Sequence, residues 1–189
     1  MRHLSTAAAL LLPATAFAHA GYDQVGGFGA GLAHPFAGLD HMVAMVALGL
    51  WAPTLGGRET PAVPAAFLAG MIAAWLLGVV EPARSLAAIG VFVSAVLLPI
   101  AVSAGLRMPV VGAVVVAALI GVLHGHAHGD EIPAGRNLTL YAAGFLMSAA
   151  ALLALGYGVA TAAMRMGRAW LVRVLSGGAV VALLYGALF

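Results

Sequence analysis

Six apolar stretches, each roughly 20 residues long and separated by short breaks, constrain this chain more than any other feature. The stretches cover residues 32–51, 63–80, 86–105, 109–128, 138–164 and 170–189. A helix needs about 20 apolar residues to cross the hydrocarbon core of a bilayer. The breaks carry glycine, proline and charged residues and are too short to hold a water-exposed domain. The pattern predicts an all-α membrane protein that forms one bundle of six transmembrane helices.

The composition points to lipid as the main solvent. Charged residues make up 7% of the 189 residues and hydrophobic residues 63%, whereas a soluble domain carries about 25% charged residues. The net charge is only +2 and the arginines are scattered singly, so no nucleic-acid partner is expected. The chain has no cysteine. A metal ion would therefore need histidine, carboxylate, methionine or backbone ligands.

The first 18 residues predict a secretory signal peptide. They begin with a positive charge, continue with an apolar segment at residues 7–12, and end with small residues. Cleavage after Ala18 would leave residues 19–189 as one transmembrane domain, and cleavage after Ala20 also fits the rule. The apolar segment is short for a membrane span. If it were retained, the chain would have seven spans.

The loop charges indicate how the bundle is oriented. A cleaved signal peptide places the new N-terminus outside the inner membrane of a bacterium, so the loops after the first, third and fifth spans face the cytoplasm. These loops and their flanks hold Arg58, Arg107, Arg165, Arg168 and Arg173. The excess of arginine in these loops agrees with the positive-inside rule, by which cytoplasmic loops carry more arginine and lysine than outer loops do. Trp51 and Trp170 lie at span ends, where indole rings commonly anchor a helix at the membrane interface.

Two groups of ionisable residues interrupt the apolar pattern. The first comprises His34, Asp40 and His41 in the first stretch, and the second comprises His124, His126 and His128 at the end of the fourth, followed by Glu131. Ionisable side chains in a bilayer are costly and usually face a bundle interior or a polar path. Because the first span runs inward and the fourth outward, both groups are expected in the outer half of the bundle. We expect the two helices to meet there, with Gly121, Gly125 and Gly129 forming a small-residue stripe that permits their close approach.

Spacing within each group suggests how an ion could be held. His124 and His128 are four residues apart and share one helix face, where they could bind the same ion. His34 and His41 would lie about 10.5 Å apart along a continuous helix, which predicts two successive stations rather than one site. Imidazole nitrogen with one carboxylate suits Ni, Co, Zn or Cu. Taken singly, His126 is more typical of a residue that hydrogen-bonds between helices.

The two groups also match motifs of a known family. The run His34-Pro35-x-x-Gly38-x-Asp40-His41-x-x-x-Met45, after a signal peptide, resembles a signature of the hydrogenase/urease accessory membrane proteins, the HupE/UreJ family. The run His124-Gly125-x-Ala127-His128-Gly129-x-Glu131-x-Pro133 is similar to the family's other signature. The resemblance extends over the whole chain.

The resemblance implies a secondary permease that carries Ni²⁺, or Co²⁺ in some members, into the cytoplasm for metalloenzyme maturation. The residues to which it assigns ion handling are His34, Asp40, His41, His124, His128 and Glu131. No permanently bound cofactor is expected, and the expected partners are the transported ion and the lipid bilayer. Glu131 fits equally well as a solvated loop residue.

Two other classes of protein stay open. One is an intramembrane zinc-dependent hydrolase, in which three histidines and an aspartate hold a metal that activates water, although no HExxH motif is present. The other is a metal-binding or sensor protein that transports nothing. The chain lacks the GxxxxGK[ST] motif and so is not expected to hydrolyse ATP. The sequence does not decide among Ni, Co and Zn, or between a monomer and a homo-oligomer.

Overall fold

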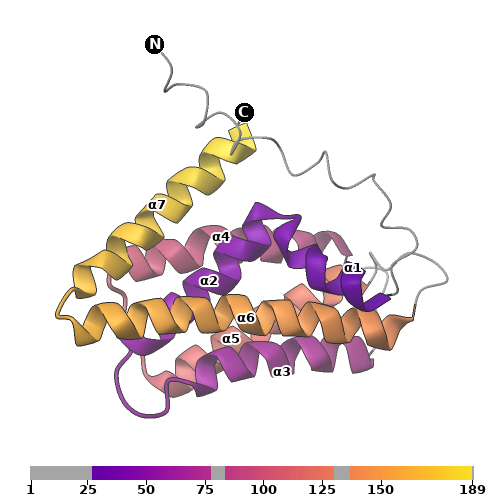
Figure 1. Ribbon diagram of the computed structural model, residues 1–189, viewed down its shortest axis with the longest axis horizontal. Helices are drawn as coiled ribbons and strands as arrows, with labels where there is room; N and C mark the ends of the chain where they lie inside the picture. Colours follow the sequence, from indigo (N-terminus) through magenta and orange to yellow (C-terminus); the bar gives the residue numbers. More distant parts are fainter. Residues whose placement is uncertain (1–26, 78–83, 130–136, 189) are drawn as a thin grey trace, which may run out of the picture.

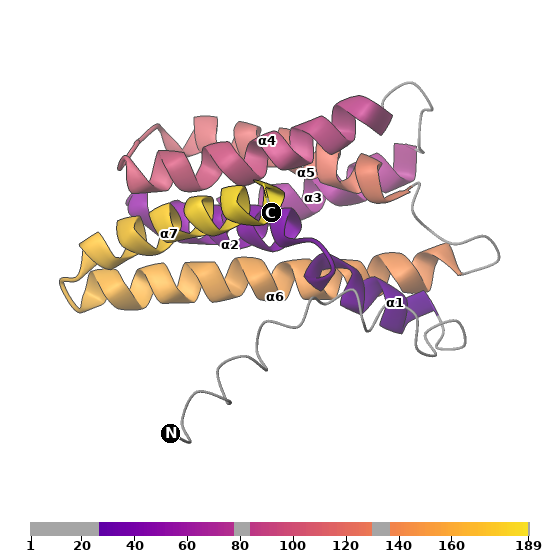
Figure 2. The same cartoon turned by 90° about the horizontal axis from the view of Figure 1, so that it is seen from above.

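The computed structural model describes residues 27–77, 84–129 and 137–188, which form helices and turns with no strand among them (Figures 1 and 2). The helices are α1 (Gly27–Ala33), the 3₁₀ turn η4 (His34–Phe36), α2 (Leu39–Thr54), α3 (Ala62–Leu77), α4 (Arg84–Ser103), α5 (Val110–Gly129), α6 (Leu138–Arg165) and α7 (Ala169–Leu188). The prediction of an all-α protein is confirmed. The expected signal peptide, both of its cleavage sites and Glu131 lie outside the described residues.

Four helices, α4 to α7, are long and apolar enough to cross a membrane, and the number rises to five if α1–η4 and α2 count as one bent segment. Each of these four helices begins and ends within two residues of an expected stretch. The helix α3 is apolar but shorter, because its described part ends at Leu77 and the expected stretch continues beyond it.

The turns that connect α2 to α3, α4 to α5, and α6 to α7 lie at one end of the bundle, whereas α1, α4 and α6 begin at the other (Figures 1 and 2). Gly56, Gly57, Gly105 and Gly167 in these three turns have φ between +69° and +92°, a conformation that costs an L side chain about 1–2 kcal/mol. Glycine therefore permits these reversals. The arginines predicted to face the cytoplasm lie in or beside the same turns, and we call this the arginine end.

Glycine contacts hold α5 against α3, not against the first span. A methyl group added at Gly121 would overlap the backbone of Phe67, and one at Gly125 would overlap that of Met71. In return, Gly70 of α3 packs against the backbone of α5. The prediction that the small-residue stripe joins the first and fourth spans is therefore wrong. The stripe permits close helix approach, but α3 offers the reciprocal glycine.

The first span uses its own glycines to pack on α6. Gly49 of α2 and Gly156 of α6 face each other, and a methyl group on either would overlap the backbone of the other helix. Gly31 of α1 and Gly144 of α6 make the same kind of reciprocal contact. Both parts of the first span are therefore fixed to α6.

The first span is not one continuous helix, contrary to the prediction for residues 32–51. The segments 27–36 and 39–54 meet at an angle of 78°. Pro35 lies in the first turn of η4, where its missing N–H is tolerated, and Gly38 then adopts an extended conformation (φ −116°, ψ 123°) that starts α2. The bend changes how the polar residues of this span are placed.

Trp51 is buried among the helices, with 4% of its surface exposed. Its indole Nε1 donates a hydrogen bond to the carbonyl oxygen of Leu106, 3.2 Å away. The bond satisfies the one polar group of the ring and ties α2 to the turn between α4 and α5. Trp170, by contrast, is 59% exposed.

Candidate metal site

Four histidines from two distant parts of the sequence lie together in the described structure. His34 comes from η4, His41 from the first turn of α2, and His124 and His128 from the last turns of α5. The ring centroids are 4.4 Å apart for His41 and His128, 4.7 Å for His34 and His128, and 5.9 Å for His41 and His124. We call these four side chains the histidine cluster. The structure thus brings together four histidines of the two predicted groups.

The bend between η4 and α2 brings His34 and His41 close to each other. Their ring centroids are 6.2 Å apart, far less than the spacing on a continuous helix. The prediction of two successive stations is therefore wrong, because it assumed an unbroken helix. Both rings belong to one cluster.

Asp40 orients the ring of His41. Its carboxylate oxygen Oδ1 accepts hydrogen bonds from the backbone N–H of His41, at 2.9 Å, and from imidazole Nδ1, at 2.6 Å. A carboxylate only accepts, so Nδ1 carries the proton and Nε2 keeps its lone pair. Nε2 is buried and has no hydrogen-bond partner within the described residues. The carboxylate therefore fixes both the tautomer and the direction of His41.

Gly38 makes room for this pair. A methyl group at Gly38 would lie 2.6 Å from Nδ1 of His41 and 2.7 Å from Oδ1 of Asp40. Both distances are too short for a carbon atom, so the side chains could not fold back over the start of α2. The glycine of the first motif thus has a steric role that the sequence alone did not reveal.

His124 presents a second buried imidazole nitrogen. Its Nδ1 donates a hydrogen bond to the carbonyl oxygen of Ile120, 2.9 Å away, one turn earlier in α5. Nε2 is then the nitrogen with a lone pair, and it too is buried with no hydrogen-bond partner among the described residues. The side chain is 0% exposed. An unsatisfied buried polar atom costs about 1–3 kcal/mol, and a ligand role is one physical reason to retain it.

The other two histidines are bonded to each other. Nε2 of His34 lies 3.0 Å from Nδ1 of His128. As arranged, no group of three or more histidine and acidic side chains in residues 27–77, 84–129 and 137–188 is placed to hold a metal ion. A site with three ligands would therefore require at least one of these two rings to turn.

Aromatic rings surround the histidine cluster. Phe67 lies 5.0 Å from His124, Phe145 lies 4.6 Å from His128, and Tyr141 lies 5.9 Å from His34, measured between ring centroids. All three aromatic side chains are almost fully buried. The sequence interpretation missed them, although the four-residue spacing of Tyr141 and Phe145 puts both on one face of α6. This apolar shell keeps water from most of the cluster.

The remaining candidate residues are less enclosed. His126, which points away from His124 and His128 by helical geometry, is only partly buried. Asp40 keeps 29% of its side chain exposed, so the pair that it forms with His41 lies at the edge of the cluster. Glu131 falls in residues 130–136, outside the described structure.

The apolar helices, bent first span and buried histidines indicate a multi-pass helical membrane protein with a polar site inside the bundle. The profile of the HupE / UreJ protein family matches residues 7–188, and the chain belongs to this family of hydrogenase and urease accessory proteins. It is 40% identical to "Protein HupE" of Rhizobium leguminosarum bv. viciae over 184 residues, which are 97% of this chain and 95% of that protein. No solved structure matches the chain.

Proposed function

We propose that this protein is a secondary permease that carries Ni²⁺, or alternatively Co²⁺, into the cytoplasm for metalloenzyme maturation. The observation that carries the proposal is the pair of buried, unbonded Nε2 atoms on His41 and His124, whose rings lie 5.9 Å apart. Each of these rings has its other nitrogen fixed by a hydrogen bond, as is usual for metal-binding histidines. Family membership supports the choice of cargo.

The first two ligands would be the Nε2 atoms of His41 and His124. His34 and His128 would join them by exchanging their mutual hydrogen bond for the ion, since both rings lie within 4.7 Å of a cluster neighbour. Asp40 would act mainly through His41, because the carboxylate increases the basicity of the ring that it orients. Its negative charge would also offset the positive end of α2.

The protein would cross the bacterial inner membrane six times after removal of a signal peptide, with the mature N-terminus outside. The common location of the three arginine-bearing turns supports this topology, because the positive-inside rule puts them in the cytoplasm. The histidine cluster would then face the outer side, where Glu131 would gather cations at the entrance. The α3 segment would be the shortest span.

Metal uptake into proteoliposomes tests the proposal. Wild-type protein is expected to accumulate Ni²⁺ or Co²⁺ above the level of empty liposomes, and Asp40→Ala and His41→Ala are expected to reduce uptake strongly. His126→Ala is the matched control, since it removes an imidazole from the same helix as His124 but outside the cluster. Equal rates for the wild type and both site variants would refute the assignment.

The purified protein and the proteoliposomes also distinguish the permease from the two alternatives, a metal-binding or sensor protein and a zinc-dependent hydrolase. Protein that binds the metal in detergent but moves none into liposomes would be a binding or sensor protein. Protein that hydrolyses a lipid amide or peptide and loses this activity with a chelator would be a zinc-dependent hydrolase.

A further inference from the structure

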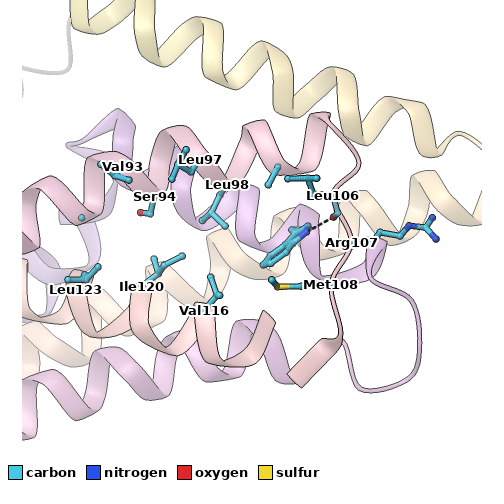
Figure 3. A pocket seen from close by; sticks show the side chains of 13 residues that line it. Val93, Ser94, Leu97, Leu98, Leu106, Arg107, Met108, Val116, Ile120 and Leu123 are labelled. Carbon is cyan, nitrogen blue, oxygen red and sulfur yellow. Dashed lines mark hydrogen bonds between the residues drawn. The ribbon is translucent and has the colours of Figure 1, made fainter. Parts of the chain in front are cut away.

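A long apolar groove lies between α4 and α5, and no histidine of the cluster is among the residues that line it (Figure 3). Val93 and Leu97 line it from α4, and Ile120 and Leu123 line it from α5. Its volume is about 430 Å³. Ser94 is the only hydroxyl in the lining, and its Oγ donates to the carbonyl oxygen of Val91. The groove therefore offers its occupant an almost wholly apolar surface.

The groove has the length of one bilayer leaflet. Its α4 lining runs from Gly90 to Ala101, which corresponds to about 16 Å of helix at 1.5 Å per residue. Half of the hydrocarbon core of a bilayer measures about 15 Å. An acyl chain in the groove would thus extend from the arginine end to about the middle of the membrane.

Among the residues that line the groove, Arg107 alone is charged, and it lies at one end. Arg107 lines this end and also lines a second, smaller hollow of about 60 Å³, which it shares with Arg173. The guanidinium of Arg173 packs over the turn at Gly105, where an added methyl group would lie 2.6 Å from Nη2. No acidic residue lines either hollow. Within the described residues, neither arginine forms an ion pair.

The turn that carries Arg107 is held in place. Trp51 lines the groove, and its hydrogen bond to the carbonyl oxygen of Leu106 fixes the residue next to Arg107. Gly105, with φ +69°, allows the chain to reverse directly before it. These contacts therefore hold the turn with Arg107 in place at the end of the apolar groove.

We propose that the α4–α5 groove binds one anionic phospholipid, with an acyl chain along the groove and the phosphate between Arg107 and Arg173. The length of the groove and the position of its charge together favour a lipid over a helix of a partner protein. Arginine suits the phosphate because its planar guanidinium can donate two parallel hydrogen bonds. The lipid would fill the groove without contacting the histidine cluster, so the proposal does not depend on metal transport.

Lipid binding to the full chain, purified in detergent and delipidated, tests the headgroup contacts. Native mass spectrometry is expected to show one phosphatidylglycerol bound in preference to phosphatidylcholine. The double variant Arg107→Gln/Arg173→Gln should reduce this preference by about 30-fold, given the contribution expected from each arginine near an anionic lipid. The matched control Arg58→Gln/Arg168→Gln removes the same charge from the same end and should keep the preference. Equal losses in both double variants would overturn the proposal, as would equal binding of the two lipids by the wild type.

A second variant tests the acyl-chain contacts. Ala101→Phe places a ring in the groove and should reduce binding of phosphatidylglycerol and phosphatidylcholine alike. Ala182→Phe, on an exposed face of α7, adds the same ring elsewhere and should leave both unchanged. Unchanged lipid binding by Ala101→Phe would show that the groove holds no acyl chain.

Discussion

The two ends of the bundle use ionisable side chains in opposite ways. Near one end, His124 and His128 are at most 1% exposed, and their rings lie beside those of His34 and His41. At the arginine end, Arg58, Arg107 and Arg165 are exposed beside turns. Buried polar groups must be bonded or bound to a ligand to be tolerated, whereas exposed guanidinium groups can reach water or lipid headgroups. Under the proposed function, cation binding would therefore be confined to the histidine end.

The largest effect should come from removing both unbonded nitrogens. The double variant His41→Ala/His124→Ala is expected to weaken Ni²⁺ binding by more than about 100-fold, which exceeds the usual effect of losing an outer-shell partner. Isothermal titration calorimetry in detergent would measure it. The double variant Arg165→Ala/Arg168→Ala, at the opposite end, should bind as the wild type does. Similar losses in both would remove the contrast between the two ends.

The next effect concerns the carboxylate that orients His41. Asp40→Asn keeps the size of the side chain but removes its charge, so Nδ1 of His41 is held less firmly. Affinity for Ni²⁺ is expected to fall by about 10- to 100-fold, as for other partners of metal-binding histidines. Glu59→Gln, which neutralises an exposed acidic residue at the arginine end, is the matched control. An Asp40→Asn affinity equal to that of the wild type would assign Asp40 no part in binding.

Glycine substitutions at the two ends should change different properties: Ni²⁺ affinity at the histidine cluster and folding stability at the arginine end. Gly38→Ala would push apart Asp40 and His41, so we expect a severalfold loss of Ni²⁺ affinity. Gly56→Ala meets no neighbouring atom within 4 Å but must keep φ near +77°. It should therefore cost about 1–2 kcal/mol of stability and leave affinity unchanged. Thermal unfolding and metal titration of both variants would check this, and the reverse pattern would contradict it.

The smallest effect is expected from a hydrogen bond at the arginine end. Tyr157 Oη and Thr60 Oγ1 lie 2.9 Å apart, and Thr60 is buried. Tyr157→Phe should reduce the free energy of unfolding by about 1 kcal/mol and lower the unfolding temperature by about 2–4 °C. Nickel affinity should not change. A large loss of affinity would mean that the two ends are coupled.

The sequence predicted where the helices lie because apolar stretches and turn residues are local signals. It also identified the ionisable residues that gather in the cluster, since so few occur within apolar segments. It did not predict the bend, because Pro35 suits both the start of a long helix and the short turn that the structure contains. The predicted distance between His34 and His41 was wrong because it assumed that the helix was continuous.

Helix partners were harder to predict than helix positions. The stripe at Gly121 and Gly125 indicates a face that can approach another helix closely, but it does not identify the other helix. Glycines with comparable surroundings occur in α2, α3 and α6, so several pairings satisfied the same rule. Trp51 shows a similar limit, because its position at a span end did not reveal that its indole is buried and bonded to Leu106.

The glycine contacts divide the helices near the site into two closely packed units. One unit contains α1, α2 and α6, joined at Gly31–Gly144 and Gly49–Gly156, and the other contains α3 and α5. His34 and His41 belong to the first unit, while His124 and His128 belong to the second. Sliding one unit past the other would therefore alter the ring distances across this boundary while every helix stayed intact. The hydrogen bond between His34 and His128 crosses this boundary.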